Sequence, residues 1–285
     1  MLLERDIKTK EVLGWKGLHL FHFSESTCSQ KTRIFLRLKG LSWESHHINL
    51  AKKEQLKPFF MGINPRGLVP VLIHDGKVII ESNDILQYLE ASFPNPPLIP
   101  SRDSERVSEL LKAEDDLHLD IRALTMRFVF PSFLAKRSEK DIASYESSGS
   151  GSVQGVEDPQ RKREAKFWRD MNTHGGITNA QTKRAYEQFK AALNQFETKL
   201  AHHTHLAGED MSLVDIAWYI YCRRLLDAGY ALTTHHPRVS SWFDRLHAIP
   251  HFREEVPGGG LLGVVTLLLH AVQKMKGETL EQVSA

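Results

Sequence analysis

The chain has 285 residues, of which 41% are hydrophobic and 25% charged, values typical of a globular protein with one large domain or two modest ones. They exclude a mostly disordered, collagen-like or disulfide-scaffold chain. The 37 basic and 35 acidic residues give a formal net charge of +2, too near neutral for a dedicated nucleic-acid-binding protein. The two cysteines, Cys28 and Cys222, suit a reducing compartment.

Neither the N-terminus nor the longest apolar run predicts a membrane protein. Charges at Glu4, Arg5 and Asp6 interrupt any apolar core, so the N-terminus does not resemble a secretory signal. The apolar run at 258–269 is shorter than the about 20 residues that a membrane span needs. We interpret this run as a C-terminal helix packed on the protein body, with a membrane-surface or partner-binding tail as the alternative. A cytoplasmic protein without a membrane span is expected.

The first 95 residues predict a small domain of strands and helices. The predicted elements are strands at 17–23 and 43–49, a helix at 31–39 that Gly40 ends, a polar connection at 51–62, a hairpin at Asp75-Gly76, and a helix that Ser82 caps. The hairpin signal is strong, because both central residues of such a turn need a positive φ.

A proline-rich segment separates this domain from a helical one. Four prolines between Pro94 and Pro100 exclude a helix or a central strand, so we predict a linker at 96–103. The second domain, 104–285, contains predicted helices at 104–130, 160–172, 180–201 and 212–228. A Ser/Gly-rich stretch at 144–159 is expected to be a flexible surface excursion, within an insertion spanning about 131–180.

The turn before the first predicted helix is the most informative segment for chemistry. It contains Ser26, Thr27, Cys28 and Ser29. A helix N-terminus offers unpaired N–H groups and a partial positive charge, which together stabilise an anion such as a thiolate. That anion is either Cys28 itself or the sulfur of a bound thiol. In the alternative, one serine caps the helix, the other hydroxyls are solvated, and Cys28 is a small packed residue.

Two further segments add ligand-binding potential. Pro70 enters a strand where it cannot donate to the ladder, which leaves the neighbouring Val69 backbone free to pair with an extended ligand. The bond before Pro70 can be cis. Glu81 can accept from an ammonium group, and Ser82 together with helix N–H groups can hold a carboxylate.

Taken together, these segments resemble the glutathione transferases. The resemblance rests on SESTCSQKTRIFLRLKGL, INPRGLVPVLIHDGKVIIES and ILQYLEASFP in the first domain, and on HLAGEDMSLVDIAW and HPRVSSWFDRLHAIPHF in the second. It covers nearly the whole chain. It implies an α/β thioredoxin-like N-terminal domain followed by an all-α C-terminal domain, with glutathione as co-substrate, a small hydrophobic electrophile as second substrate, and a homodimer.

The resemblance also implies roles for individual residues. The implied glutathione-binding residues are Gln55, Lys57, Leu68, Val69, Pro70, Glu81 and Ser82. Among them, the Val69 main chain would pair with the cysteinyl part beside a cis Pro70, and Glu81 and Ser82 would bind the γ-glutamyl end. Gln55 would bind the glycyl carboxylate, with Lys53 and Lys57 as nearby candidates.

The sequence is compatible with more than one subclass and more than one mechanism. The STCSQKTR turn resembles the zeta-class isomerases and reductive dehalogenases, whereas the run from INPRG to ES and the long insertion look most like the bacterial β-aryl etherases and related fungal enzymes. In one mechanism a hydroxyl, Ser26 before Ser29, donates to the glutathione sulfur, which attacks the electrophile. In the other, Cys28 is the nucleophile for thiol transfer, reductive dehalogenation or deglutathionylation. A non-enzymatic binding module is the third possibility.

The remaining histidines and aromatic residues receive simpler interpretations. The histidine groups at 46–47, 202–205 and 235–236 are taken as surface residues, and no metal site is predicted. Most aromatic residues of the second domain are expected in the core, with Phe128, Trp168 and Tyr221 as candidates for the apolar substrate pocket.

Overall fold

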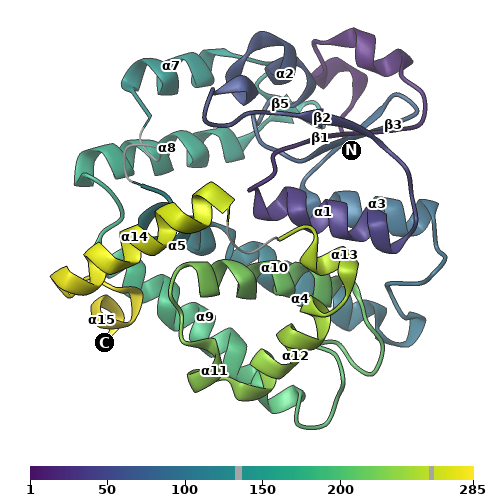
Figure 1. Ribbon diagram of the computed structural model, residues 1–285. Helices are drawn as coiled ribbons and strands as arrows, with labels where there is room; N and C mark the ends of the chain where they lie inside the picture. Colours follow the sequence, from purple (N-terminus) through teal and green to yellow (C-terminus); the bar gives the residue numbers. More distant parts are fainter. Residues whose placement is uncertain (132–136, 257–259) are drawn as a thin grey trace. The chain divides into compact units, whose positions relative to one another are not determined.

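The computed structural model describes residues 1–131, 137–256 and 260–285. The chain divides into two compact units (Figure 1). The first unit contains Met1–Phe93 together with Lys136–Gly175, and the second contains Pro94–Ala135 together with Gly176–Ala285. The first boundary therefore falls at the start of the proline-rich segment, close to the predicted linker.

A four-stranded sheet forms the centre of the first unit. Its strands are β1 (Leu18–His22), β2 (Glu44–His47), β3 (Val71–His74) and β4 (Lys77–Ile80), in the order β2-β1-β3-β4. β1 and β2 are parallel, whereas β3 pairs antiparallel with both β1 and β4. The hairpin between β3 and β4 turns at Asp75 and Gly76, which have φ values of 48° and 77°, as the Asp-Gly pair predicted.

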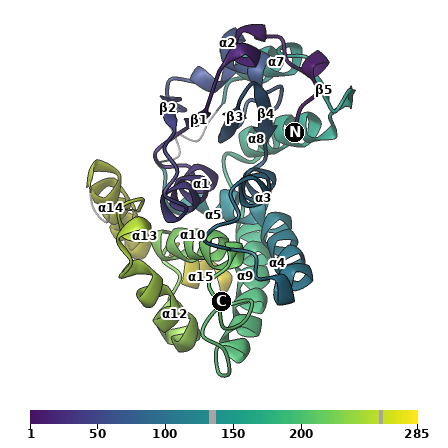
Figure 2. The same ribbon diagram turned by 90° about the vertical axis from the view of Figure 1, so that its right-hand side faces the viewer.

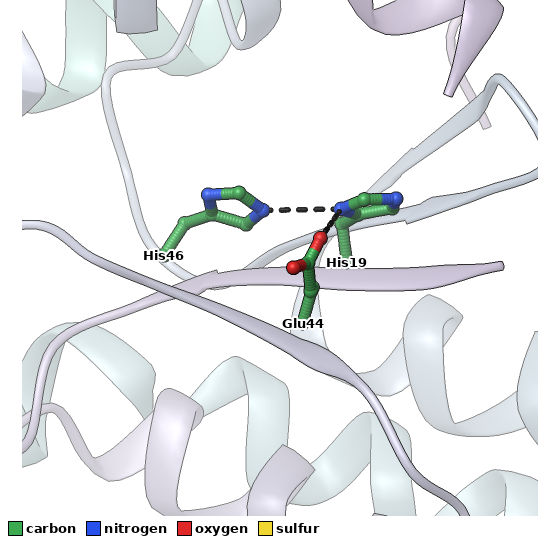
Figure 3. Close-up of side chains that lie close together, drawn as sticks. All are labelled: His19, Glu44 and His46. Carbon is green, nitrogen blue, oxygen red and sulfur yellow. Dashed lines mark hydrogen bonds and ion pairs between the residues drawn. The ribbon is translucent and has the colours of Figure 1, made fainter. Parts of the chain in front are cut away.

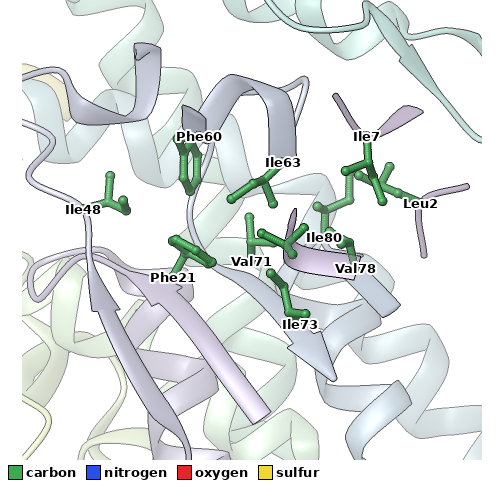
Figure 4. Packing of buried hydrophobic residues seen from close by; sticks show 11 residues of the cluster. Leu2, Ile7, Phe21, Ile48, Phe60, Ile63, Val71, Ile73, Val78 and Ile80 are labelled. Atoms are coloured by element: carbon green, nitrogen blue, oxygen red, sulfur yellow. The ribbon is translucent and has the colours of Figure 1, made fainter. Parts of the chain in front are cut away.

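Each face of the sheet is covered by helices, because successive strand residues point to opposite sides. α1 (Thr27–Leu38) and α3 (Ser82–Ser92) lie together on one face, and α2 (Pro58–Ile63) covers the other (Figures 1 and 2). On the α2 face, Phe21, Val71 and Ile80 join a buried cluster with Phe60 (Figure 4). Burial of each such side chain contributes about 1.5–3 kcal/mol to stability.

The polar connection at 51–62, for which the sequence analysis predicted no element, is partly helical. It contains a 3₁₀ helix, η3 (Glu54–Leu56), followed by α2, whose first residue is Pro58. Proline is well suited to that position, because it has no N–H to leave unpaired and its φ is already helical. Further 3₁₀ turns are η1 (Glu4–Asp6), η2 (Lys10–Gly14) and η4 (Ser101–Asp103).

The predicted flexible excursion is instead folded and belongs to the first unit, not to the helical domain in which we expected the insertion. It contains α7 (Glu139–Ser147), β5 (Ser152–Val153), β6 (Val156–Glu157) and α8 (Pro159–His174). Its glycines serve turns, since Gly149, Gly151 and Gly155 all have φ between 70° and 77°.

A buried ion pair attaches this insertion to the rest of the first unit. The Asp158 carboxylate, with a side chain only 1% exposed, accepts from Arg66 Nε at 2.7 Å and from Arg66 Nη2 at 2.9 Å. The hydroxyl of Tyr145 donates to the Arg66 carbonyl at 3.0 Å. Two residues of the insertion thus hold opposite ends of Arg66, which explains why a polar, glycine-rich sequence packs here.

The second unit is helical, as predicted. Its helices are α4 (Ser104–Asp116), α5 (His118–Phe128), α9 (Asn179–Lys199), α10 (Leu213–Asp227), α11 (Leu232–His235), α12 (Pro237–His247), α13 (Pro250–Arg253), α14 (Gly260–Lys276) and α15 (Leu280–Ser284). The expected single helix at 104–130 is two helices, which separate at Leu117. At the start of α10 the buried Asp215 accepts from the Ser212 N–H at 2.8 Å and from Trp242 Nε1 at 2.9 Å.

The C-terminal apolar run forms most of α14, although residues 257–259 lie outside the described part of the chain. The side of this helix that meets the C-terminus of α5 is polar: Thr266 Oγ1 donates to the Val129 carbonyl and Gln273 Nε2 to the Arg127 carbonyl, at 3.1 and 3.2 Å. Leu267 and Leu268 are exposed. Among the described residues, no helix has the length and apolar character that crossing a membrane requires.

The Arg66–Asp158 pair leads to a prediction about stability. Replacing Asp158 with alanine removes one of the two carboxylates that pair with the largely buried Arg66 guanidinium. Breaking a buried ion pair in this way typically lowers the free energy of unfolding by about 3–5 kcal/mol. We expect Asp158→Ala to lower the free energy of unfolding by about 3 kcal/mol, measured by urea denaturation.

The matched control is Asp170→Ala, because Asp170 also lies in the insertion but forms an exposed i,i+4 pair with Lys166. Its loss should cost less than about 0.5 kcal/mol. Equal effects of the two substitutions would contradict a specific role for the buried pair.

Candidate functional site

Ser26, Thr27, Cys28 and Ser29 lie at the start of α1, the position that the sequence analysis expected for them. Ser26 is the N-cap residue, and its Oγ accepts from the Ser29 N–H at 3.3 Å. Because that bond uses a lone pair, the hydroxyl hydrogen of Ser26 can still be donated to an anion. Ser26 and Cys28 are both partly exposed, and Cys28 is the second residue of the helix. A hydroxyl and a thiol therefore share the positive end of α1.

Ser29 is placed differently from Ser26. It is completely buried, and its Oγ accepts from the Phe23 N–H at 3.3 Å. The side chain thus connects the helix to the end of β1. This burial favours a structural role for Ser29 and leaves Ser26 as the hydroxyl better placed for a ligand.

A buried arginine holds the backbone of the turn. Arg33 Nη1 donates to the Phe23 carbonyl at 3.2 Å, and Arg33 Nη2 donates to the Ser24 carbonyl at 3.1 Å. Arg33 Nη1 also lies 3.0 Å from His22 Nδ1. Burial, together with the positive charge of Arg33, lowers the pKa of His22 from 6.5 to about 4. His22 is therefore neutral at physiological pH and can accept from the guanidinium.

The second predicted segment has its expected backbone geometry. The Val69–Pro70 peptide bond is cis. The β1–β3 ladder ends at the pair Phe21–Val71, so Val69 lies beyond its last paired residue. The carbonyl of Leu68 accepts from Asn64 Nδ2 at 2.8 Å, which fixes the chain just before the cis bond.

The third segment begins α3. Glu81 occupies the N-cap position with a φ of 66°, a conformation that L-residues seldom adopt and that often marks ligand sites, and Ser82 is the first residue of the helix. Arg66 Nη1 donates to Glu81 Oε1 at 2.6 Å. The Glu81 side chain is 38% exposed, so its carboxylate still reaches solvent while Arg66 orients it.

Arg66 and Asp158 are site residues that the sequence analysis missed. Burial alone would lower the pKa of Arg66, but hydrogen bonds and charges from Asp158 and Glu81 outweigh burial and raise it. The guanidinium is therefore permanently charged. Arg66 stands in the NPRG turn, and Asp158 precedes Pro159 and caps α8 by accepting from the Gln160 N–H. The sequence shows the turn that contains Arg66 and the helix start that Asp158 caps. It does not show that these two residues, 92 positions apart, form an ion pair.

The residues predicted to bind the glycyl end of glutathione differ in exposure and in the partners of their side chains. Gln55 is 4% exposed, and no described residue forms a hydrogen bond with its buried Oε1. Lys57 is exposed, with its Nζ 3.7 Å from Glu54 Oε1. Lys53 Nζ donates to Asp141 Oδ2 of the insertion at 2.5 Å. Both lysines therefore already have acidic neighbours.

The three predicted pocket residues are packed inside their units. Phe128 and Tyr221 are buried in the second unit, and Trp168 is buried in the first, where its Nε1 donates to Glu164 Oε1 at 2.8 Å. Their burial indicates a packing role, and Trp168 belongs to a different unit from the other two. Cys222 is also buried, which raises the pKa of its thiol and makes it unreactive.

Comparisons with known proteins connect this geometry to a family. The glutathione S-transferase N-terminal domain matches residues 20–97, and the glutathione S-transferase C-terminal domain matches residues 164–250. The chain is 47% identical over 83 residues to glutathione S-transferase 1 of Dianthus caryophyllus. That alignment covers 29% of this chain and 38% of the relative, so the chain matches well under half of that relative's length.

Other relatives are less similar but align over most of the chain. Protein LigF of Sphingobium sp. strain SYK-6 is 26% identical, over 83% of this chain and 92% of LigF. The crystal structure of the β-etherase LigF superimposes with a TM-score of 0.69 at 24% identity, covering 84% of this chain and 98% of that chain. A probable maleylacetoacetate isomerase of Vibrio cholerae is 26% identical over 85% of this chain and 96% of its own length. With both family domains present in order, the chain belongs to the glutathione S-transferase family.

Proposed function

We propose that the protein is a glutathione transferase in which the first turn of α1 stabilises the thiolate of glutathione. The observation that carries this proposal is the placement of Ser26, whose Oγ accepts from the Ser29 N–H while its hydroxyl hydrogen remains available. One hydrogen bond to a charged acceptor contributes about 1.5–3 kcal/mol. Together with the positive end of the helix, that is enough to ionise much of a bound thiol near neutral pH.

The rest of the glutathione molecule would be held by the other two segments. Glu81, oriented by Arg66, accepts from the γ-glutamyl ammonium, and Ser82 with the N-terminus of α3 binds the γ-glutamyl carboxylate. The Val69 main chain pairs with the cysteinyl part. Gln55 reaches the glycyl end, where its buried Oε1 accepts from an N–H and its Nε2 donates to the carboxylate. Leu68, Pro70 and Lys57 complete the proposed set of glutathione-binding residues.

Bound glutathione supplies the nucleophile, and we propose that its partner is a small hydrophobic electrophile, with an aryl ether as the leading class. Attack forms a carbon–sulfur bond and breaks the carbon–oxygen bond, whose electron pair leaves on the phenolate oxygen and takes up a proton from water. Support for this class comes from the similarity to LigF, described as a β-etherase, over 83% of the chain. The proposal includes a homodimer, as expected for the family, and a cytoplasmic location that suits the low cysteine count.

A second candidate function uses Cys28, which is partly exposed in the first turn of α1. Its thiolate would attack the glutathionyl sulfur of a mixed disulfide, forming a Cys28–glutathione disulfide and releasing the other thiol. A second glutathione would then release oxidised glutathione and restore Cys28. The same helix end supports either thiolate.

The first prediction of the proposed function separates capping by Ser26 from its hydrogen-bond donation. Glycine at an N-cap costs only a few tenths of a kcal/mol, so Ser26→Gly should fold normally while it lacks the hydroxyl. We expect kcat/KM for glutathione conjugation to fall about 10- to 100-fold, the equivalent of 1.5–3 kcal/mol.

Two variants serve as controls for this experiment. Ser26→Thr retains a hydroxyl and should retain activity, whereas Ser24→Ala removes an exposed hydroxyl two residues earlier and should have no effect. Full activity of Ser26→Gly would contradict the proposed role of the hydroxyl.

The second prediction concerns Cys28. Under the main proposal, Cys28→Ser and Cys28→Ala both retain conjugation of the electrophile, because the attacking sulfur belongs to glutathione. Steady-state conjugation and deglutathionylation assays on the same preparations test this. Loss of conjugation in both variants would overturn the proposal, and loss of deglutathionylation alone would assign the second activity to Cys28.

A further inference from the structure

Two histidines and a glutamate meet on the α2 face of the sheet. In the parallel pairing of β1 with β2, His19 lies opposite Glu44 and Phe21 lies opposite His46. Because alternate strand residues share a face, all four side chains lie on one side of the sheet. Figure 3 shows the two imidazole rings and the carboxylate pointing toward one another from the two strands.

The spacing of the three groups matches a metal-binding site. His19 Nδ1 lies 3.1 Å from His46 Nε2 and 3.4 Å from Glu44 Oε2. Zinc bonds of about 2.0–2.1 Å place neighbouring ligand atoms of a tetrahedron about 3.3 Å apart. The three ligand atoms all lie within 4.8 Å of one another. In the described ranges, no other three residues among the histidines, cysteines, aspartates and glutamates bring their ligand atoms this close together.

The surroundings prepare His19 and His46 for this role. His19 Nε2 lies 2.9 Å from the Lys16 carbonyl, which fixes the proton on Nε2 and leaves the Nδ1 lone pair facing His46. The centroid of the Trp15 ring lies 4.7 Å from that of His19 and 5.1 Å from that of His46. The Phe21 ring stacks on the His46 ring, with 4.5 Å between their centroids.

We propose that His19, Glu44 and His46 form a zinc site with a fourth position open to water. Two imidazoles and one carboxylate are a common zinc ligand set, and the Glu44 side chain is 73% exposed, so solvent reaches the site. Along β1, Leu20 and His22 point to the face opposite that of His19. On that face, His22 contacts Arg33 of α1. The sheet therefore separates the metal from the first turn of α1, and its expected effect is on the pairing of β1 with β2.

Binding of Zn²⁺ by the metal-depleted full chain tests the proposal. A calorimetric titration with zinc chloride should show that one equivalent of Zn²⁺ binds. Co²⁺ in place of Zn²⁺ should give the visible absorption of a tetrahedral site. Because ligands that bind only the folded state stabilise it, zinc should also raise the unfolding midpoint of the wild-type chain.

Variants decide where the metal binds. His46→Gln and, separately, Glu44→Gln should weaken Zn²⁺ binding at least about tenfold and abolish the cobalt signal, whereas His202→Gln, which removes an exposed histidine elsewhere, should change neither. Glu44 is exposed, so its variant should fold even if His46→Gln does not. Absence of a saturable equivalent, or equal binding by Glu44→Gln and wild type, would overturn the site. Loss of binding in His202→Gln would indicate adventitious surface binding.

Discussion

The arrangement of the proposed thiolate site depends on the buried Arg33 guanidinium. It donates to the carbonyls of Phe23 and Ser24, three and two residues before the helix cap, and it lies against the neutral His22 at the end of β1. The backbone of the turn is therefore fixed before any ligand arrives, and Ser26 is held at the helix end. Preorganised donors stabilise a developing charge without the cost of rearrangement, so the fixed backbone supports the role that we propose for this helix start in binding an anion.

Arg66 has a comparable role at the other end of the proposed glutathione site. Its guanidinium connects Glu81, at the start of α3, to Asp158 of the insertion, and its carbonyl accepts from Tyr145. The folding of the insertion and the orientation of Glu81, the proposed recognition residue, thus both depend on one buried charge. The segment that resembles a surface excursion in sequence therefore supports, through Arg66, the residue that we propose to bind the γ-glutamyl end.

Local signals predicted much of this architecture. The Asp-Gly pair between β-branched runs located the hairpin of β3 and β4, an apolar-rich run located β1, and the expectation that one serine caps the first helix was met at Ser26, because each is a short-range effect of backbone sterics or hydrogen bonding. The Arg66–Asp158 pair, the folded 144–159 segment and the His19–His46 contact depend on tertiary register. A single charged or imidazole side chain has no periodicity, so nothing in the sequence indicated its partner.

The most direct test of the account is the pKa of the glutathione thiol in its complex with the full chain, measured from the ultraviolet absorbance of the thiolate as pH is raised. An ordinary thiol has a pKa of about 8.5. We predict a value of about 7 in the wild-type complex, since 1.5–3 kcal/mol from one charged hydrogen bond corresponds to a decrease of about one to two pH units. A pKa that stays at the value of free glutathione, or one that is equally low in Ser26→Gly, would contradict thiolate stabilisation by this turn.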